Sequence, residues 1–198
     1  MKIFNINNFI NSCNFEITPH ISASKNENFA AANIQEKEIV DQLNKKFKLN
    51  NIPFTAVWSK NVKGWNSTID RAHGDIYICA KLENGDITIL KYIDLKVTDH
   101  GSKFKDWTAT ITRESFDEFS KYSNHLYLCM NSTGSKFILI DASRLKTTIE
   151  LSEEDPWTAS KYESNNREKD YLQGKWMIKM YEYIKALKYG KENSRRSL

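Results

Sequence analysis

Residues 74–98, GDIYICAKLENGDITILKYIDLKVT, decide the fold, because two strand-like runs in them are joined by a turn signal. Residues 74–80 and 87–98 are rich in β-branched and aromatic residues, and Asn84-Gly85 lies between them. Asn-Gly is the strongest short hairpin signal, since both central residues of a type I′ turn need a positive φ. The sequence therefore predicts a hairpin with a two-residue turn.

Such a turn brings two aspartates together. Asp75 and Asp94 lie equally far from the turn on the two runs, so they become cross-strand partners with Cβ atoms roughly 5 Å apart. Like charges so placed destabilise a sheet unless a positive charge lies between them, and a divalent metal ion is the obvious candidate. Lys96 points to the same face as Asp94, because side chains alternate along a strand.

The alternative is a solvent-facing hairpin whose acidic residues meet by chance. Tyr77 with Tyr92, and Cys79 with Leu90, should share the face of the aspartates, and they suit a half-buried cleft better than open solvent. Lys91 alone interrupts the opposite face, which otherwise carries Ile76, Ile78, Ile89, Ile93, Leu95 and Val97. This pattern favours a functional site over a chance pair.

Length and composition limit the class of protein. The chain has 198 residues, of which 40% are hydrophobic, and this suits one domain with a real core. The net charge of +4 is compatible with a polyanionic partner. Three scattered cysteines form no Cys-x-x-Cys pair, which argues against a zinc knuckle or a disulfide framework and favours a reducing, cytoplasmic compartment. Residues 1–15 lack a continuous apolar run, so we expect neither a signal peptide nor a membrane span.

A helix should precede the hairpin. Ser24-x-x-Glu27 has the form of a capping box, and the helix that follows has an apolar face made of Phe29, Ala32, Ile39, Val40, Leu43 and Phe47. Glu36 lies in the middle of this face. It is either a helix-edge carboxylate that reaches solvent or part of a site.

The remaining segments are assigned from periodicity and turn residues. Strands are expected at residues 54–59, 125–130 and 136–142, and a helix at residues 112–122 with Phe116 and Phe119 inward. A long amphipathic helix is expected at residues 169–189, with irregular or short-stranded structure at residues 1–23 and loop at residues 157–167. This order of elements predicts an α/β sandwich with a mixed central sheet.

The Asp75 … Asp94-Leu95-Lys96 arrangement resembles the PD-(D/E)XK nuclease superfamily, which has the restriction-endonuclease-like fold. The core of that family, helix–strand–strand–strand–helix–strand, is similar to residues 24–142 here. Proteins of this family commonly carry an acidic residue in the first core helix, and Glu36 is the matching position. One departure is that no proline precedes Asp75.

The resemblance implies a single domain over residues 1–198, with an α/β/α sandwich as its core. An added C-terminal helical extension would cover residues 143–190, and residues 191–198 would form a disordered tail. Asp75 and Asp94 would bind Mg²⁺, for which Mn²⁺ can substitute, with the backbone carbonyl of Leu95 as a third ligand. Lys96 would position or activate the nucleophile, and Glu36, or else Asp70, would assist.

These expectations lead to a function. A Mg²⁺-dependent endonuclease acting on double-stranded DNA is expected, of the restriction type and working as a homodimer; the alternatives are a structure-selective nuclease and an inactive nucleic-acid-binding module. Eight residues are candidates for contacts with nucleic-acid phosphates, and the alternative for each is an ordinary residue of the surface. They are Lys60, Lys63, Arg71, His73, Thr98, Lys103, Lys105 and Arg113. The tryptophans that could stack on bases, or else pack in the interior, are Trp58, Trp65 and Trp107.

Overall fold

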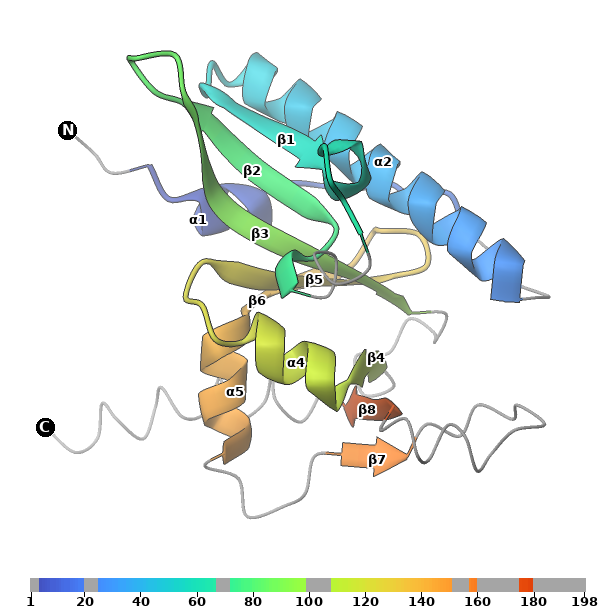
Figure 1. Ribbon diagram of the computed structural model, residues 1–198. Helices are drawn as coiled ribbons and strands as arrows, with labels where there is room; N and C mark the ends of the chain where they lie inside the picture. The colour runs from blue at the N-terminus through green and yellow to red at the C-terminus, as the bar shows by residue number, and fades with distance from the viewer. Residues whose placement is uncertain are drawn as a thin grey trace, which may run out of the picture.

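A computed structural model describes the backbone of residues 4–19, 25–66, 72–98, 108–150, 157–159 and 175–179. Its centre is a five-stranded mixed sheet in the order β1-β2-β3-β5-β6 (Figure 1). The strands are β1 Phe54–Trp58, β2 Ile76–Lys81, β3 Ile87–Thr98, β5 His125–Asn131 and β6 Phe137–Asp141. Only β3 and β5 run parallel, and the other neighbours are antiparallel. The predicted mixed central sheet is therefore confirmed.

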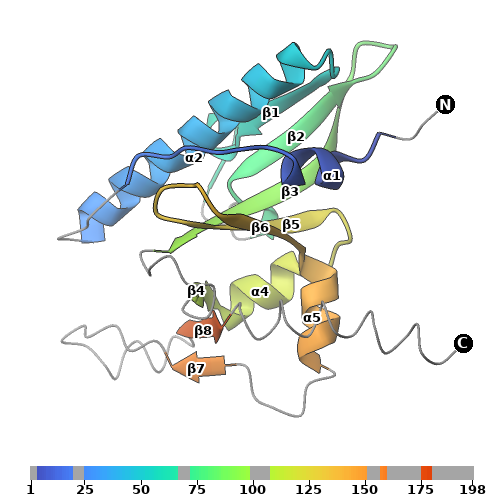
Figure 2. The same cartoon turned by 180° about the vertical axis from the view of Figure 1, so that it is seen from behind.

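Helices cover both faces of this sheet, as the two opposite views show (Figures 1 and 2). The long helix α2 (Lys25–Leu49) and the short helix α1 (Ile6–Asn11) lie on one face. On the other face lie α4 (Arg113–Phe119) and α5 (Ala142–Glu150). A three-residue 3₁₀ turn, η1 (Ser59–Asn61), follows β1. The molecule is thus a three-layer α/β/α sandwich.

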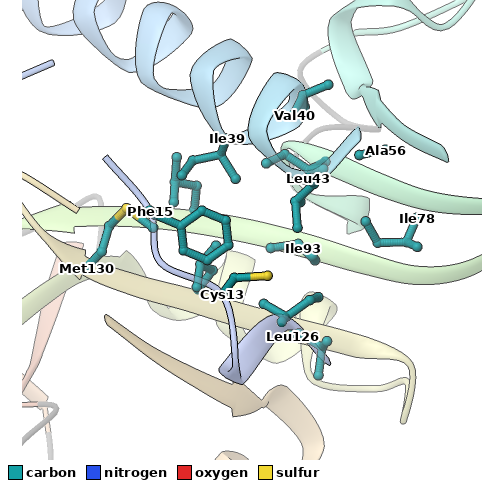
Figure 3. Close-up of a cluster of buried hydrophobic side chains, with 14 of the residues drawn as sticks. Cys13, Phe15, Ile39, Val40, Leu43, Ala56, Ile78, Ile93, Leu126 and Met130 are labelled. Carbon is teal, nitrogen blue, oxygen red and sulfur yellow. The ribbon is translucent and has the colours of Figure 1, made fainter. Parts of the chain in front are cut away.

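The main core lies between α2 and the sheet (Figure 3). Ile39 and Leu43 of α2 are fully buried, as the predicted apolar face requires. They pack on the residues of β2 and β3 that were predicted to face inward, among them Ile78 and Ile93. Cys13 and Phe15, which follow α1, close this core from the side. The N-terminal segment is therefore part of the core, and α1 corrects the expectation of an irregular or short-stranded beginning.

The β2–β3 hairpin is present, but its turn differs from the prediction. The Gly85 amide donates to the Leu82 carbonyl at 2.9 Å, and Gly85 alone of the central pair has a positive φ, of 89°. The turn thus belongs to a longer loop and is not the predicted two-residue type I′ turn. This shifts the strand pairing near the tip by one residue, so that Cys79 lies opposite Ile89 and not Leu90.

A β-bulge at Leu90 restores the predicted register before the strands reach the aspartates. Beyond the bulge, Ile78 pairs with Lys91, Tyr77 with Tyr92, and Ile76 with Ile93. Two departures from the simple hairpin therefore cancel, because a bulge adds one residue to one strand only. Asp75 comes next after this last pair, and its amide donates to the Ile93 carbonyl; the paired residues end at Ile76 and Ile93, so the direct pairing of Asp75 with Asp94 stays a prediction.

The C-terminal part corrects the expected helical extension at residues 143–190. After α5, β7 (Trp157–Ala159) and β8 (Lys175–Lys179) join β4 (Thr108–Thr112) in a second, antiparallel sheet in the order β4-β8-β7. The helix expected at 169–189 is thus wrong at residues 175–179, and the expected loop is wrong at residues 157–159. Trp176, Met177 and Ile178 form a short apolar run, and periodicity cannot distinguish a strand from a buried helix in such a run.

The helix expected at residues 112–122 is confirmed in its position. It covers residues 113–119, and Phe116 and Phe119 are buried, whereas Tyr122 is 46% exposed. Ser24 and the expected tail at residues 191–198 lie outside the described residues. Among the helices in the described ranges, none combines the length and the apolar character needed to cross a membrane.

Candidate active site

Asp75 lies at the start of β2 and is held by three hydrogen bonds. Its amide donates to the carbonyl of Ile93 at 2.8 Å, and its carbonyl accepts from the Ser59 amide at 2.8 Å. Its side-chain Oδ2 accepts from the Leu95 amide, also at 2.8 Å. The side chain is therefore turned toward the backbone of β3, and only 9% of the residue remains exposed.

Gly74 makes this approach possible. It has a φ of 73°, and a Cβ atom there would lie 2.7 Å from the Ile93 carbonyl oxygen and 3.0 Å from the Asp94 amide nitrogen. Real Cβ atoms essentially never come so close to backbone atoms. Only glycine lets the chain pass this close to β3 in this backbone conformation, and this passage brings Asp75 beside Asp94.

Asp94 and Lys96 form an ion pair on β3. The Lys96 Nζ lies 2.8 Å from both Oδ1 and Oδ2 of Asp94. The two side chains are 26% and 15% exposed for lysine and aspartate respectively, so the pair lies at the rim of the buried region. The predicted common face of Asp94 and Lys96 is confirmed by this contact.

Glu36 enters from α2 and is 5% exposed. Its Oε2 accepts a hydrogen bond from the Trp58 indole at 2.5 Å and lies 2.9 Å from the Lys60 Nζ, which is 3.2 Å from Oε1. Lys60 also donates to the Asn33 side chain at 2.6 Å. Glu36 is thus a buried, paired carboxylate, and the interpretation of a helix-edge residue that reaches solvent is wrong.

The charges of these groups are coupled. Burial raises the pKa of Asp75 well above its ordinary value, and the negative charges of Asp94 and Glu36 raise it further. The Lys96 charge and the Leu95 amide act in the opposite direction without cancelling the rise. Asp75 therefore lies within the negative field of two other carboxylates, where a proton or another cation lowers the free energy.

The same negative charges also shift the pKa of Lys96, where they stabilise the charged form. Burial alone would lower its pKa, but the charges of Asp94 and Asp75 and the hydrogen bond to Asp94 outweigh burial and raise it. The charged form of Lys96 is therefore favoured in this ion pair. This agrees with the roles of a positive charge and a hydrogen-bond donor.

The carboxylates of Asp75 and Asp94 fit a cation such as Mg²⁺, which needs few protein ligands, better than a metal that is fully enclosed by protein ligands. Within the described residues, no cluster of three or more His, Cys, Asp or Glu side chains forms a metal-binding group. Mg²⁺ commonly binds through one or two carboxylates and keeps several waters or substrate oxygens. Asp75 and Asp94 supply such a pair of carboxylates, and the excess negative charge around Asp75 agrees with a cation there.

The expected phosphate contacts have different outcomes. Lys60 is bound to Glu36 and Asn33, Lys63 is exposed, and the His73 ring stacks on Tyr92 with centroids 4.9 Å apart. Thr98 ends β3 and Arg113 begins α4, but their side chains lie outside the described residues, as do the whole of Asp70, Arg71, Lys103 and Lys105.

The sequence did not predict a cluster of aromatic rings around His125, which packs against Tyr92 of β3. His125 stacks on Tyr92 at 4.6 Å and on Tyr122 at 4.9 Å between ring centroids, and Phe119 meets it edge-on at 4.6 Å. Its Nε2 lies 3.1 Å from the carbonyl oxygen of Ala72. The only signal in the sequence was a histidine that opens an otherwise apolar strand.

Comparison with known proteins gives a distant structural likeness. No protein-family model and no curated protein matches the sequence. Among solved structures, a nuclease from a fusselovirus is similar, with 13% sequence identity, a TM-score of 0.46, and coverage of 82% of this chain and 88% of that chain. At such identity, function has to come from the residues of the site themselves.

Proposed function

We propose that the chain is a metal-dependent nuclease whose reaction centre is formed by Asp75, Asp94 and Lys96, with Glu36 as a third carboxylate. The observation that carries this proposal is the arrangement around Leu95: the Leu95 amide donates to the Asp75 carboxylate, and on either side of Leu95 the Asp94 carboxylate and the Lys96 Nζ form an ion pair at 2.8 Å. Burial and the negative charges of Asp94 and Glu36 raise the pKa of Asp75. A divalent cation held by Asp75 and Asp94 would offset this repulsion.

The residues divide the chemistry of phosphodiester hydrolysis between them. A bound Mg²⁺ supplies charge neutralisation and polarises the phosphoryl oxygen. Asp75 and Asp94 would hold it, with the Leu95 carbonyl as a further ligand, and Glu36 would assist in binding metal or water. Lys96, whose charged form is favoured beside Asp94, orients the attacking water and stabilises the charge that develops around phosphorus.

Double-stranded DNA is the substrate that we propose, and the net charge of +4 supports a polyanion. A restriction-type activity is the finer form of the proposal. Because palindromic duplex sites are read by two-fold symmetric proteins, this form carries a homodimer with it. A structure-selective nuclease would use the same reaction centre with a surface that reads shape.

The test is cleavage of a panel of plasmid DNA, phage DNA, branched DNA and RNA, with and without about 5–10 mM Mg²⁺. The Asp94→Ala and Lys96→Ala variants run beside the wild type, and Asp86→Ala serves as the matched control because Asp86 is exposed at the hairpin tip. We expect Mg²⁺-dependent cleavage that Asp94→Ala and Lys96→Ala abolish and Asp86→Ala keeps. Discrete bands support the restriction type, and cleavage of branched DNA alone supports the structure-selective type.

Binding separates the enzyme from an inactive module. A mobility-shift assay of Lys96→Ala should show retained nucleic-acid binding without cleavage. The proposal is wrong if the wild type binds nucleic acid but cleaves nothing in the panel, or if cleavage proceeds equally without metal and in Asp94→Ala.

A further inference from the structure

His125 stands out because it is buried and bonded yet has no place in the proposed reaction. It opens β5 and is 1% exposed. Its two ring nitrogens face different partners, since Nε2 lies 3.1 Å from the Ala72 carbonyl oxygen and Nδ1 lies 3.0 Å from the Asn124 side chain. It therefore connects the strand next to β3 with the segment that leads into Asp75.

The partner of Nε2 shows that this nitrogen carries a proton, because a carbonyl oxygen can only accept. Burial lowers the pKa of His125 to about 4, the nearby charges of His73 and Lys91 act in the same direction, and the bond to Ala72 opposes them. A neutral imidazole has one N–H, and a carbonyl oxygen can only accept, so the proton lies on Nε2. In the neutral ring Nδ1 is an acceptor, so the Asn124 side chain would turn its amide nitrogen toward Nδ1 in place of the Oδ1 that lies 3.0 Å from it here.

The bond between His125 and Ala72 lies in the short segment that leads into Asp75. Ala72 precedes Gly74, whose backbone passes so close to Ile93 that no Cβ atom fits. The bond to Ala72 and the bond from the Asp75 amide to Ile93 at 2.8 Å lie at the two ends of this short passage. A passage of so few residues fixed at both ends determines where the Asp75 carboxylate lies.

We propose that His125 is a positioning residue, whose single Nε2–H holds the Ala72 carbonyl and thereby sets the place of Asp75 beside Asp94. This inference rests on the proposed function in so far as Asp75 is a metal ligand. The competing explanation is that His125 serves only as a packing ring among Tyr92, Phe119 and Tyr122. The two explanations separate because the ring and the N–H can be removed independently.

Two substitutions make this separation. His125→Phe keeps a flat ring for stacking and removes the donor, whereas His125→Gln removes the ring and keeps an N–H near the position of Nε2. We expect His125→Phe to raise the dissociation constant for Mn²⁺ about tenfold or more, and His125→Gln to stay within about threefold of the wild type. The melting temperatures should show the opposite order, because Phe preserves the aromatic packing. A packing role alone predicts that His125→Gln is the weaker variant in both measurements.

A metal-free measurement keeps this test independent of the proposed function. Hydrogen exchange of the Asp75 amide should be faster in His125→Phe than in His125→Gln, whether or not the protein binds Mn²⁺. If the wild type binds no Mn²⁺ but exchange follows this order, the metal-dependent function fails and the positioning role stands. Equal or reversed exchange rates overturn the positioning role.

The tautomer can be read in the unmodified protein, which avoids any variant that fails to fold. Long-range ¹⁵N–¹H correlation spectra of the histidine rings distinguish a proton on Nε2 from one on Nδ1. We expect the Nε2–H form for His125, with a proton that exchanges slowly. A ring protonated on Nδ1 would have no donor for Ala72, and that result would overturn the proposal.

Discussion

The two ends of the β2–β3 hairpin each contain a glycine with a positive φ, but their surroundings differ. At the tip, Gly85 has a φ of 89°, and an added Cβ atom would meet nothing within 4 Å. At the other end, Gly74 has a φ of 73°, and an added Cβ atom would lie 2.7 Å from the carbonyl oxygen of Ile93. The tip needs glycine for its backbone angle alone, and the site end needs it also for space.

This difference shows how the position of Asp75 is determined. The tip departs from a two-residue turn, yet the register beside Asp75 is unaffected because the bulge at Leu90 absorbs the difference. At the site end, hydrogen bonds to Ile93 and from Ser59 and Leu95 fix Asp75 directly. The geometry of the site therefore depends on tertiary contacts of its own and not on the turn that connects the strands.

The largest effect should come from Gly74→Ala. The methyl group would push the chain away from β3, lengthen the Asp75–Ile93 bond and move the carboxylate from Asp94. We expect a loss of about 3 kcal/mol or more in the free energy of unfolding, together with loss of the proposed cleavage activity. Urea unfolding and the plasmid assay measure the two consequences.

Gly85→Ala is the matched control for that prediction. It has the same unfavourable φ but open space around it, so we expect a cost of roughly 1 kcal/mol and full activity at a temperature where the variant is folded. Equal losses of activity in the two variants would show that the turn sets the site geometry after all, and the contrast between the two ends would be wrong.

Lys60→Met tests the ion pair between Lys60 and Glu36. Lys60 is 21% exposed and bonded to a carboxylate that is nearly inaccessible, so removing it takes a positively charged partner from a buried carboxylate. We expect a loss of about 2–3 kcal/mol in the free energy of unfolding, toward the low end for buried pairs because Lys60 is partly exposed. Combining it with Glu36→Gln should recover part of the loss.

Lys37→Met provides the comparison within the same cluster. The Nζ of Lys37 lies 4.4 Å from the centroid of the Trp58 ring, and that of Lys60 lies 5.4 Å from it and is also bonded to Glu36. Lys37→Met should cost less than about 1 kcal/mol. Similar losses in the two variants would mean that contact with Trp58, and not the Glu36 ion pair, is what Lys60 contributes.

The sequence was sufficient for the features that depend on local periodicity. The alternation of residues along β2 and β3 identified the shared face of Asp94 and Lys96, and the 3.6-residue period of α2 placed Glu36 on the buried face. The register of the three pairs next to Asp75 was also predicted, although by a turn that is not present, because the deviation at the tip and the bulge compensate each other.

The features that the sequence did not predict depend on contacts between distant segments. Lys60 pairs with Glu36, 24 residues earlier, and His125 contacts Ala72, 53 residues earlier, and no periodicity encodes such distances. Similarly, β8 is a strand because β4 and β7 pair with both of its edges. Local propensity leaves that choice open, and tertiary pairing decides it.

The smallest effect should come from Asp75→Asn in the metal-free protein. This substitution should stabilise the protein at pH 7, although it removes a site residue. The folded-state pKa of Asp75 is raised by burial and by Asp94 and Glu36, so the folded protein binds its proton more tightly than the unfolded chain does. Stability from this group is therefore present below the unfolded-state pKa of about 4 and is lost as the pH rises through the folded-state value. Asparagine has no charge to lose and can still accept the Leu95 bond. Its melting temperature should exceed that of the wild type at pH 7, and the difference should vanish near pH 3.

Asp86→Asn at the tip shows whether that gain belongs to the site end. Asp86 is exposed, and its carboxylate accepts a hydrogen bond only from the neighbouring Asn84 side chain among the contacts resolved for it, at 2.6 Å. We expect its substitution to change the melting temperature little at either pH. Adding Mg²⁺ completes the argument, because a cation that takes the place of the proton should stabilise the wild type and Asp86→Asn but not Asp75→Asn. If Asp75→Asn were instead destabilising at pH 7 without metal, the carboxylate would be contributing to the fold itself, and its repulsion with Asp94 and Glu36 could not be the reason for a cation site.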